Sequence, residues 1–405
     1  MGRGKTLATN LGLVVLAVVI ILGALEAALA IMKFNTPSAS RFIPSKGTTY
    51  IPHAYYHHTK EGFSEGYFNS HGFRDYERTY EKPAGVFRIL VLGDSYIEAL
   101  QVQLEDSFTA LLEKILNAHA SSPQFEVLAL GQSGFGTAEE FVRYLNFGLA
   151  YNPDLVVVAF LTGNDFQDNS RFLNRESVGF YFSFDHSHNL VLDRSLIDGY
   201  ESSLTLPKRI FQELKTKSHL LALISERIYL LRRQLLETRM EEAYGEVESA
   251  VDEKTKGLSL FSYLNIYRRD LPPPWKEAVE ITKQIILNFK RSVEERGSQF
   301  LLLGLSNAEQ VHPEIGNKLT KQYKIEFDYE QPDRILEEFT RENGVLFLKL
   351  MPKFRDYHLK TGSYLHGFGG SHGGHWNHKG HRLAAKLTFQ FLMDQHLVPL
   401  ESKTP

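Results

Sequence analysis

The sequence contains no cysteine and no excess of basic residues, and each absence excludes a class of function. Without cysteine the chain has no disulfides, no thiolate nucleophile and no cysteine-ligated zinc. Its 45 basic residues are balanced by 48 acidic ones, for a net charge of -3, so the charge does not indicate binding to nucleic acid. The lack of cysteine leaves the cellular compartment open, because many exported bacterial proteins also lack it.

Long apolar runs are confined to the N-terminus, and that segment bears on the compartment. Residues 11–25 are all apolar or small, and residues 27–32 continue the run beyond Glu26. About 20 apolar residues are enough for a transmembrane helix. Arg3 and Lys5 precede the run, which favours an N-terminus in the cytoplasm and the rest of the chain outside it.

A cleaved signal peptide is the alternative interpretation of this segment. Residues 28–30, Ala-Leu-Ala, fit a small-x-small cleavage site. We favour an uncleaved membrane anchor at residues 1–34, because the run is long and Glu26 is unusual so near a cleavage site. Either interpretation exports the following domain, so we expect a single-pass protein whose domain lies on the periplasmic side of a bacterial membrane.

The remaining sequence alternates strand-like and helix-like segments. Apolar runs typical of buried strands occupy residues 87–92, 125–130, 155–160, 300–305 and 345–350. Helical spacing of apolar residues follows at 105–118, 138–149, 275–296, 332–343 and 378–392. This alternation predicts an α/β fold, a flavodoxin-like three-layer sandwich around a five-stranded parallel sheet.

One long segment interrupts the alternation and divides the chain into parts. We expect a linker and lead-in at 35–85, the α/β domain at 86–168 and 275–396, and a largely helical insert at 169–274. Within the insert, residues 178–192 alternate like a hairpin, 207–243 have a helical pattern, and 241–256 are acidic and expected to form a mobile loop. We interpret the helical part as a cap; a substrate lid, or a basic amphipathic helix on the membrane, are the alternatives.

A serine follows the first strand of the predicted sheet, in the sequence Gly93-Asp94-Ser95. Ligands bind at the carboxyl edge of open α/β sheets, and a helix that begins there offers free N–H groups to an anion. Ser95 is therefore a candidate nucleophile. Helix capping is the alternative role for a serine at this place.

Three further segments favour the nucleophile. Gly134 follows the second strand in Gly-Gln-Ser-Gly-Phe-Gly, Asn164 follows the third in Thr-Gly-Asn-Asp, and His375 precedes the last helix in His-Trp-Asn-His. With this order of Ser, Gly, Asn and His, the chain resembles the SGNH (GDSL-type) hydrolases from about residue 87 to 392. Residues 68–75 look like the lead-in of membrane-anchored bacterial members.

The resemblance implies roles for the matching residues. Ser95 would attack an ester carbonyl, with His375 as its base. The N–H groups of Ser95 and Gly134 and the side-chain amide of Asn164 would hold the oxyanion, and Asp94 and Asn377 would support the site. Neither a cofactor nor a metal is required. The expected substrate is an ester-linked acyl or acetyl group on an envelope glycan or lipid, and transfer of that group is a close variant.

The chain departs from the family pattern just before His375. The family usually has an aspartate two or three residues earlier to orient the histidine, whereas this chain has Gly373 and His372. A backbone carbonyl would then orient the ring, or a distant acid such as Asp356 or Asp165 would reach it. The third alternative is a catalytically silent protein that binds a glycan or an envelope partner.

Histidines gather in the same C-terminal stretch, which raises a metal-binding alternative. They are His366, His372, His375, His378 and His381. Neutral imidazoles bind zinc, nickel and copper. No carboxylate is interspersed among them, and His375 already matches the hydrolase pattern, so we prefer the catalytic interpretation and predict no metal there.

Overall fold

The computed structural model describes residues 2–34, 37, 39–174, 178–187, 189–248 and 258–400. Its centre is a sheet of five parallel strands in the order β11-β10-β7-β5-β6. The strands are β5 (Val86–Gly93), β6 (Gln124–Ala129), β7 (Leu155–Leu161), β10 (Gln299–Leu305) and β11 (Phe347–Lys349). The first strand lies between the second and third, so the predicted flavodoxin-like sheet is confirmed.

Helices cover both faces of the sheet because the side chains of its buried strands alternate between two apolar layers. In β5, Leu90 and Leu92 face one layer and Ile89 and Val91 face the other. The first layer contains α4 (Thr137–Asn146), α10 (Pro273–Glu294) and α13 (Gln331–Glu342). The second contains α3 (Phe108–His119), α14 (Met351–Thr361) and α15 (His378–Asp394).

Shorter helices connect these elements. They are α2 (Ser95–Glu98), α5 (Asp165–Asp168), α6 (Arg171–Asn174), α7 (Ser195–Ser203), α11 (Ala308–Val311) and α12 (Pro313–Tyr323). Single 3₁₀ turns form at Leu104–Asp106, Gly148–Tyr151 and Tyr263–Tyr267. Two of these helices, α2 and α12, begin beside the sites discussed below.

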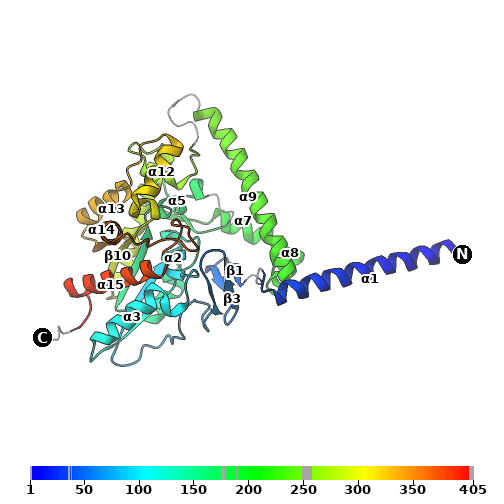
Figure 1. Cartoon of the computed structure of the whole chain (residues 1–405), viewed down its shortest axis with the longest axis horizontal. Coiled ribbons are helices and arrows are strands. Elements are labelled where there is room, and N and C mark those ends of the chain that lie inside the picture. Colours follow the sequence, from blue (N-terminus) through cyan, green and yellow to red (C-terminus); the bar gives the residue numbers. More distant parts are fainter. Residues whose placement is uncertain are drawn as a thin grey trace.

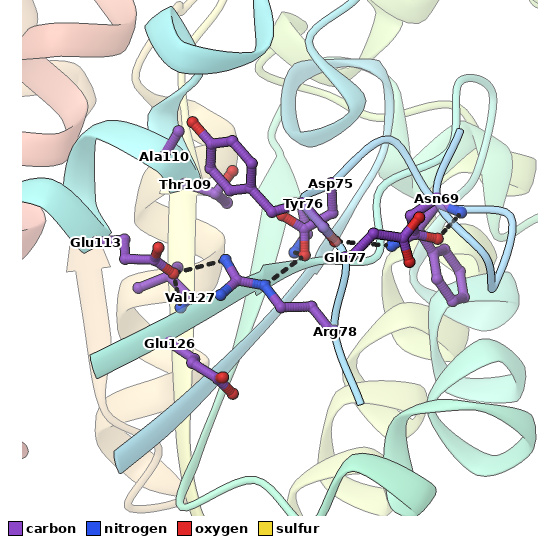
Figure 2. Close-up of polar contacts among 12 residues, drawn as sticks. Asn69, Asp75, Tyr76, Glu77, Arg78, Thr109, Ala110, Glu113, Glu126 and Val127 are labelled. Atoms are coloured by element: carbon purple, nitrogen blue, oxygen red, sulfur yellow. Dashed lines mark hydrogen bonds and ion pairs between the residues drawn. The ribbon is translucent and has the colours of Figure 1, made fainter. Parts of the chain in front are cut away.

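The segment between the N-terminal helix and the sheet is folded against the domain. It forms two small antiparallel pairs, β1 (Ser40–Ile43) with β2 (Gly47–Tyr50) and β3 (Tyr55–His58) with β4 (Ser64–Tyr67). The following stretch is attached to α3 and β6 (Figure 2), where the Arg78 guanidinium lies 2.6 Å from Glu113 and 3.4 Å from Asp75. Glu113 also accepts the Val127 N–H at 2.7 Å. These bonds fix the lead-in to the outer strand of the sheet.

The insert contains the expected hairpin, β8 (Tyr181–Phe184) with β9 (Leu190–Asp193), but its helical part differs from expectation. The single helical pattern is two helices, α8 (Leu206–Lys215) and α9 (His219–Glu248). The first helix ends at Lys215, and the second begins after Ser218, whose hydroxyl accepts the Leu221 N–H and so caps the new helix. The prediction of an acidic loop at 241–256 is wrong for residues 241–248, because α9 continues to Glu248. Residues 249–256 lie outside the described residues.

The N-terminal helix α1 (Gly2–Ile31) extends away from the domain (Figure 1). Its residues Thr9–Ile31, 23 in all, are long and apolar enough to cross a membrane, a test that a signal sequence also passes. At its domain end, the Glu26 carboxylate accepts hydrogen bonds from the Ser218 hydroxyl at 2.8 Å and from the His219 N–H at 2.7 Å. The one acid in the apolar run thus binds the N-terminus of α9.

Candidate active site

Ser95 lies at the carboxyl edge of the sheet, where β5 turns into α2. Asp94 caps this short helix by accepting the Tyr96 N–H at 2.9 Å, so Ser95 is the first residue of α2 and not its cap. The turn is tight, because a Cβ on Gly93 would lie 2.3 Å from Ile97. The Ser95 N–H has no acceptor among the described residues, so it remains available to a ligand.

The structure brings Ser95 and His375 together and adds an acid that the sequence did not predict. Ser95 Oγ lies 2.8 Å from His375 Nε2, and His375 Nδ1 lies 2.6 Å from Glu61 Oε2. Glu61 Oε1 also accepts the backbone N–H of His375 at 2.7 Å. A serine, a histidine and a carboxylate therefore form one hydrogen-bonded line, the arrangement of a catalytic triad.

Glu61 comes from the loop between β3 and β4, in the segment expected to be a linker. Its approach depends on Gly374, whose φ of +92° lies in the left-handed region. A Cβ at position 374 would lie 2.2 Å from Glu61 Oε1, so the carboxylate occupies the space that a side chain would fill. The Phe63 N–H donates to the Gln101 carbonyl at 3.1 Å and anchors the loop beside α2.

The carboxylate sets the state of the histidine. Burial opposes ionisation of Glu61, but hydrogen bonds from the His375 ring and backbone lower the pKa of Glu61 below its ordinary value. An ionised carboxylate only accepts, so His375 Nδ1 carries the proton. In the neutral form of the ring the lone pair is then on Nε2, which faces the Ser95 hydroxyl, as a general base requires.

Residues beside His375 hold its backbone in place. The Trp376 side chain is fully buried and packs against Tyr96, whose hydroxyl donates to the Gly374 carbonyl at 3.2 Å. Asn377 caps α15 by accepting the Lys379 N–H at 2.9 Å. These contacts fix the chain on both sides of the imidazole.

Gly134 lies in the loop after β6, on one side of Ser95. The Gln132 N–H donates to the Gly93 carbonyl at 3.0 Å, which joins this loop to the end of β5. The buried Arg143 side chain donates to the Gly131 carbonyl and the Gln132 side chain and stacks over Phe135. Gly134 itself has a φ of +80°, and its N–H has no acceptor among the described residues. The loop thus presents a free N–H group at the edge that carries Ser95.

Asn164 follows β7 on the other side of β5. Its side-chain Nδ2 donates to Asp168 Oδ2 at 2.7 Å, and the Asn164 side chain also hydrogen-bonds to the Asp94 carboxyl, so two acids orient the amide. Since β7 and β6 flank β5, Asn164 and Gly134 approach the edge of Ser95 from opposite sides. Their placement agrees with the predicted oxyanion roles, which remain predictions.

Three carboxyl groups are buried beneath this edge. Burial raises the pKa of Asp94 to about 6. It also raises the pKa values of Glu140 and Asp165 well above the ordinary range, and the three groups disfavour one another's charge. Asp165 accepts the Leu161 N–H at 2.9 Å, and Asp356 pairs with Lys360 at 2.7 Å, so the two acids considered for His375 bind elsewhere.

The C-terminal histidines point to different partners. His366 Nε2 bonds to the Ser306 carbonyl at 2.9 Å, His381 Nδ1 accepts the Phe108 N–H at 3.1 Å, and His375 faces Ser95. Each of these three bonds takes its ring to a different element, and the absence of a metal in this stretch stays a prediction.

A scan of protein-family models finds no match, and a search of curated proteins finds none either. Among solved structures, the chain is similar to the acetyl xylan esterase AlAXEase at 12% identity and a TM-score of 0.40, over 76% of this chain and 100% of that one. It is similar to TesA at 14% identity and a TM-score of 0.38, over 77% and 99%. It is also similar to a catalytic mutant of Axe2, an acetylxylan esterase from Geobacillus stearothermophilus, at 12% identity and a TM-score of 0.38, over 80% of this chain and 100% of that one. Such distant likeness adds nothing to the observed topology, so function has to be inferred from the side chains.

Proposed function

We propose that this protein is a serine ester hydrolase of the SGNH type, with Ser95 as nucleophile, His375 as general base and Glu61 as the acid that orients it. The observation that carries the proposal is the continuous hydrogen-bonded line from Glu61 through His375 to Ser95, with distances of 2.6 and 2.8 Å. A silent binding protein has no need of this alignment, so the line favours an enzyme.

The reaction follows from the positions of the protons. His375 Nε2 takes the Ser95 proton as Oγ attacks the ester carbonyl carbon, and the carbonyl oxygen becomes an oxyanion. The N–H groups of Ser95 and Gly134 and the Asn164 amide would stabilise that charge, and loss of one such donor typically costs about 10²–10³ in rate. His375 then gives the proton to the departing alcohol oxygen, leaving an acyl group on Ser95.

Release of the acyl group repeats these steps with a second nucleophile. His375 takes a proton from water, the hydroxide oxygen attacks the acyl carbon, and Ser95 recovers its proton as the carboxylic acid leaves. A sugar hydroxyl in place of water would make the protein an acyltransferase. Both outcomes use the same three side chains, so we propose the esterase as the simpler activity.

The substrate and location follow from the N-terminal helix. We propose that α1 anchors the protein in the membrane and that the domain lies on its periplasmic side, as Arg3 and Lys5 before the apolar run favour. A tethered hydrolase there would meet O-acylated or O-acetylated glycans and lipids of the envelope.

Fluorophosphonate labelling of the detergent-solubilised full chain tests the proposal. We expect the parent to be labelled, Ser95→Ala to be unlabelled, and His375→Ala to be labelled at least about 10³-fold more slowly, since the base acts on every attack. Ser202→Ala, which removes an exposed hydroxyl that donates to the nearby Gly199 carbonyl, is the matched control. A folded parent that takes no label, or a Ser95→Ala variant labelled like the parent, would contradict the proposal.

A further inference from the structure

A second cluster of ligand-type side chains lies outside the proposed active site, between α12 and α14. It consists of His312, the N-cap of α12, Glu314 in the first turn of that helix, and His358 near the end of α14. One ligand atom from each lies within 4.8 Å of the others. We propose that these three residues bind a divalent transition-metal ion of the zinc class.

The hydrogen bonds around His312 leave one ring nitrogen bare. His366 Nε2 lies 2.9 Å from the Ser306 carbonyl, which only accepts, so Nε2 carries the proton and Nδ1 of the neutral ring is an acceptor. That Nδ1 lies 3.2 Å from His312 Nε2, which must then be the donor. His312 Nδ1 is therefore unprotonated, and it is buried without a hydrogen-bond partner among the described residues.

The second histidine is oriented in the same manner. His358 Nδ1 lies 3.1 Å from the Ser363 carbonyl and donates to it, so the lone pair is on Nε2. Metal-binding histidines commonly donate their other N–H to a carbonyl or a carboxylate, which fixes the tautomer. Both histidines donate their other N–H in this way. His312 donates to His366, and His358 donates to the Ser363 carbonyl.

The carboxylate completes a set of three. Glu314 Oε2 lies 3.5 Å from His358 Nε2, and the Tyr364 hydroxyl donates to the same carboxylate. Tetrahedral zinc with bonds of about 2.0–2.1 Å separates its ligand atoms by about 3.3–3.4 Å, so the two atoms already have a suitable spacing. The His312 ring lies 4.4 Å from the His358 ring, nearly perpendicular to it, so small rotations converge the lone pairs.

Access from solvent also suits a metal ion. The Glu314 side chain is 48% exposed, which gives an ion a path from solvent. Tyr364 and His366, which bond to Glu314 and His312, also line a hollow of about 470 Å³. Two histidines and one glutamate leave a fourth position for water.

The ion would join α12 and α14 to the loop that carries the catalytic histidine. The three proposed ligands are held by hydrogen bonds with Ser363, Tyr364 and His366. His366 also pairs in a β-bridge with Trp376, the neighbour of His375. Tyr364 also stacks on His372 with ring centroids 3.6 Å apart. A metal here braces the glycine-rich loop 367–374 from one side while Glu61 holds it from the other.

Metal content and cobalt titration of the full chain test this site. The protein is purified in detergent with a histidine-free tag, stripped with a chelator, and titrated with Zn²⁺ and with Co²⁺, whose visible spectrum reports tetrahedral nitrogen and oxygen ligands. Glu314→Gln keeps an acceptor for Tyr364, and His358→Asn keeps a donor for the Ser363 carbonyl, so each removes a ligand atom with little change in packing. His119→Gln, an exposed histidine on α3, is the matched control.

We expect about one ion per chain in the parent and in His119→Gln. Affinity should fall more than about 10²-fold in Glu314→Gln and in His358→Asn, because loss of an outer partner alone costs about 10–100-fold. A folded parent that retains no metal would overturn the proposal, leaving Glu314 and His358 as an ordinary ion pair. Equal affinity in parent and both variants, or binding lost only in His375→Ala, would overturn it by placing the ion elsewhere.

Discussion

Replacing Glu61 by glutamine tests the least expected feature of the site. Each carboxylate oxygen accepts one hydrogen bond from His375, one from the ring and one from the backbone. Glutamine has only one acceptor oxygen, so its NH₂ group must face either the backbone N–H or ring Nδ1. In the first case two donors clash; in the second Nδ1 accepts, the proton moves to Nε2, and the base is lost.

The size of the effect follows from these bonds. A hydrogen bond to a charged group contributes about 1.5–3 kcal/mol, which corresponds to about 10–150-fold in rate if it acts only in the transition state. The Glu61 and His375 side chains are 25% and 27% exposed, so solvent screening favours the lower part of that range. The wrong tautomer costs more, about 10⁴-fold in triad enzymes. We therefore expect the Glu61→Gln substitution to lower the reaction rate by between about 10-fold and 10⁴-fold.

The assay is the rate of fluorophosphonate labelling together with hydrolysis of p-nitrophenyl acetate by the full chain. Glu65→Gln is the matched control, because Glu65 lies in the same hairpin but pairs with Lys33 and Tyr55 at the surface. Its rates should stay within about threefold of the parent, as for most surface changes. A folded Glu61→Gln protein that also stays within threefold would refute the assignment of Glu61 and leave His375 without a required acid.

Two further predictions concern close packing and buried charge. Gly374→Ala should slow labelling at least about 10²-fold, because the new methyl group displaces the Glu61 carboxylate. Gly369→Ala is the control, because Gly369 also has a positive φ but has open space around it, and it should not slow labelling. Equal effects of the two substitutions would show that only backbone strain matters. Burial raises the pKa of Asp333 to about 7. Ionising this carboxyl in the folded state therefore costs on the order of 4 kcal/mol of stability above pH 7, and the cost disappears below the ordinary pKa near 4. Asp333→Asn should therefore raise the melting temperature at pH 8 and lose that advantage by pH 4; the same advantage at both pH values would contradict this sign.

The sheet could be predicted because its signal is local. Each strand is a short apolar run followed by an amphipathic helix, and burial on both faces requires such runs. The boundaries of the long helical pattern in the insert were not predictable in this way. The division between α8 and α9 involves Ser218 and its contact with Glu26, which lies 192 residues earlier in the chain.

The candidate site also contains residues that local sequence predicts and residues that only the folded structure reveals. Ser95, Gly134 and Asn164 each follow a strand, so their common edge is a consequence of the parallel topology. Glu61 lies 314 residues from His375 in a hairpin whose sequence has no apolar periodicity that would place it. Likewise, His312 and His358 belong to different helices, and only the hydrogen bonds of their rings identify the free lone pairs.

The distance along the chain between nucleophile and base has a consequence for biosynthesis. Ser95 and His375 are separated by 280 residues, and synthesis proceeds from the N-terminus at about 5–20 residues per second. The serine therefore leaves the ribosome about 15–60 s before its base exists. Under the proposed mechanism, the nascent chain has no activated nucleophile while it is being threaded across the membrane, and hydrolytic competence begins only after the C-terminal helix has closed the fold.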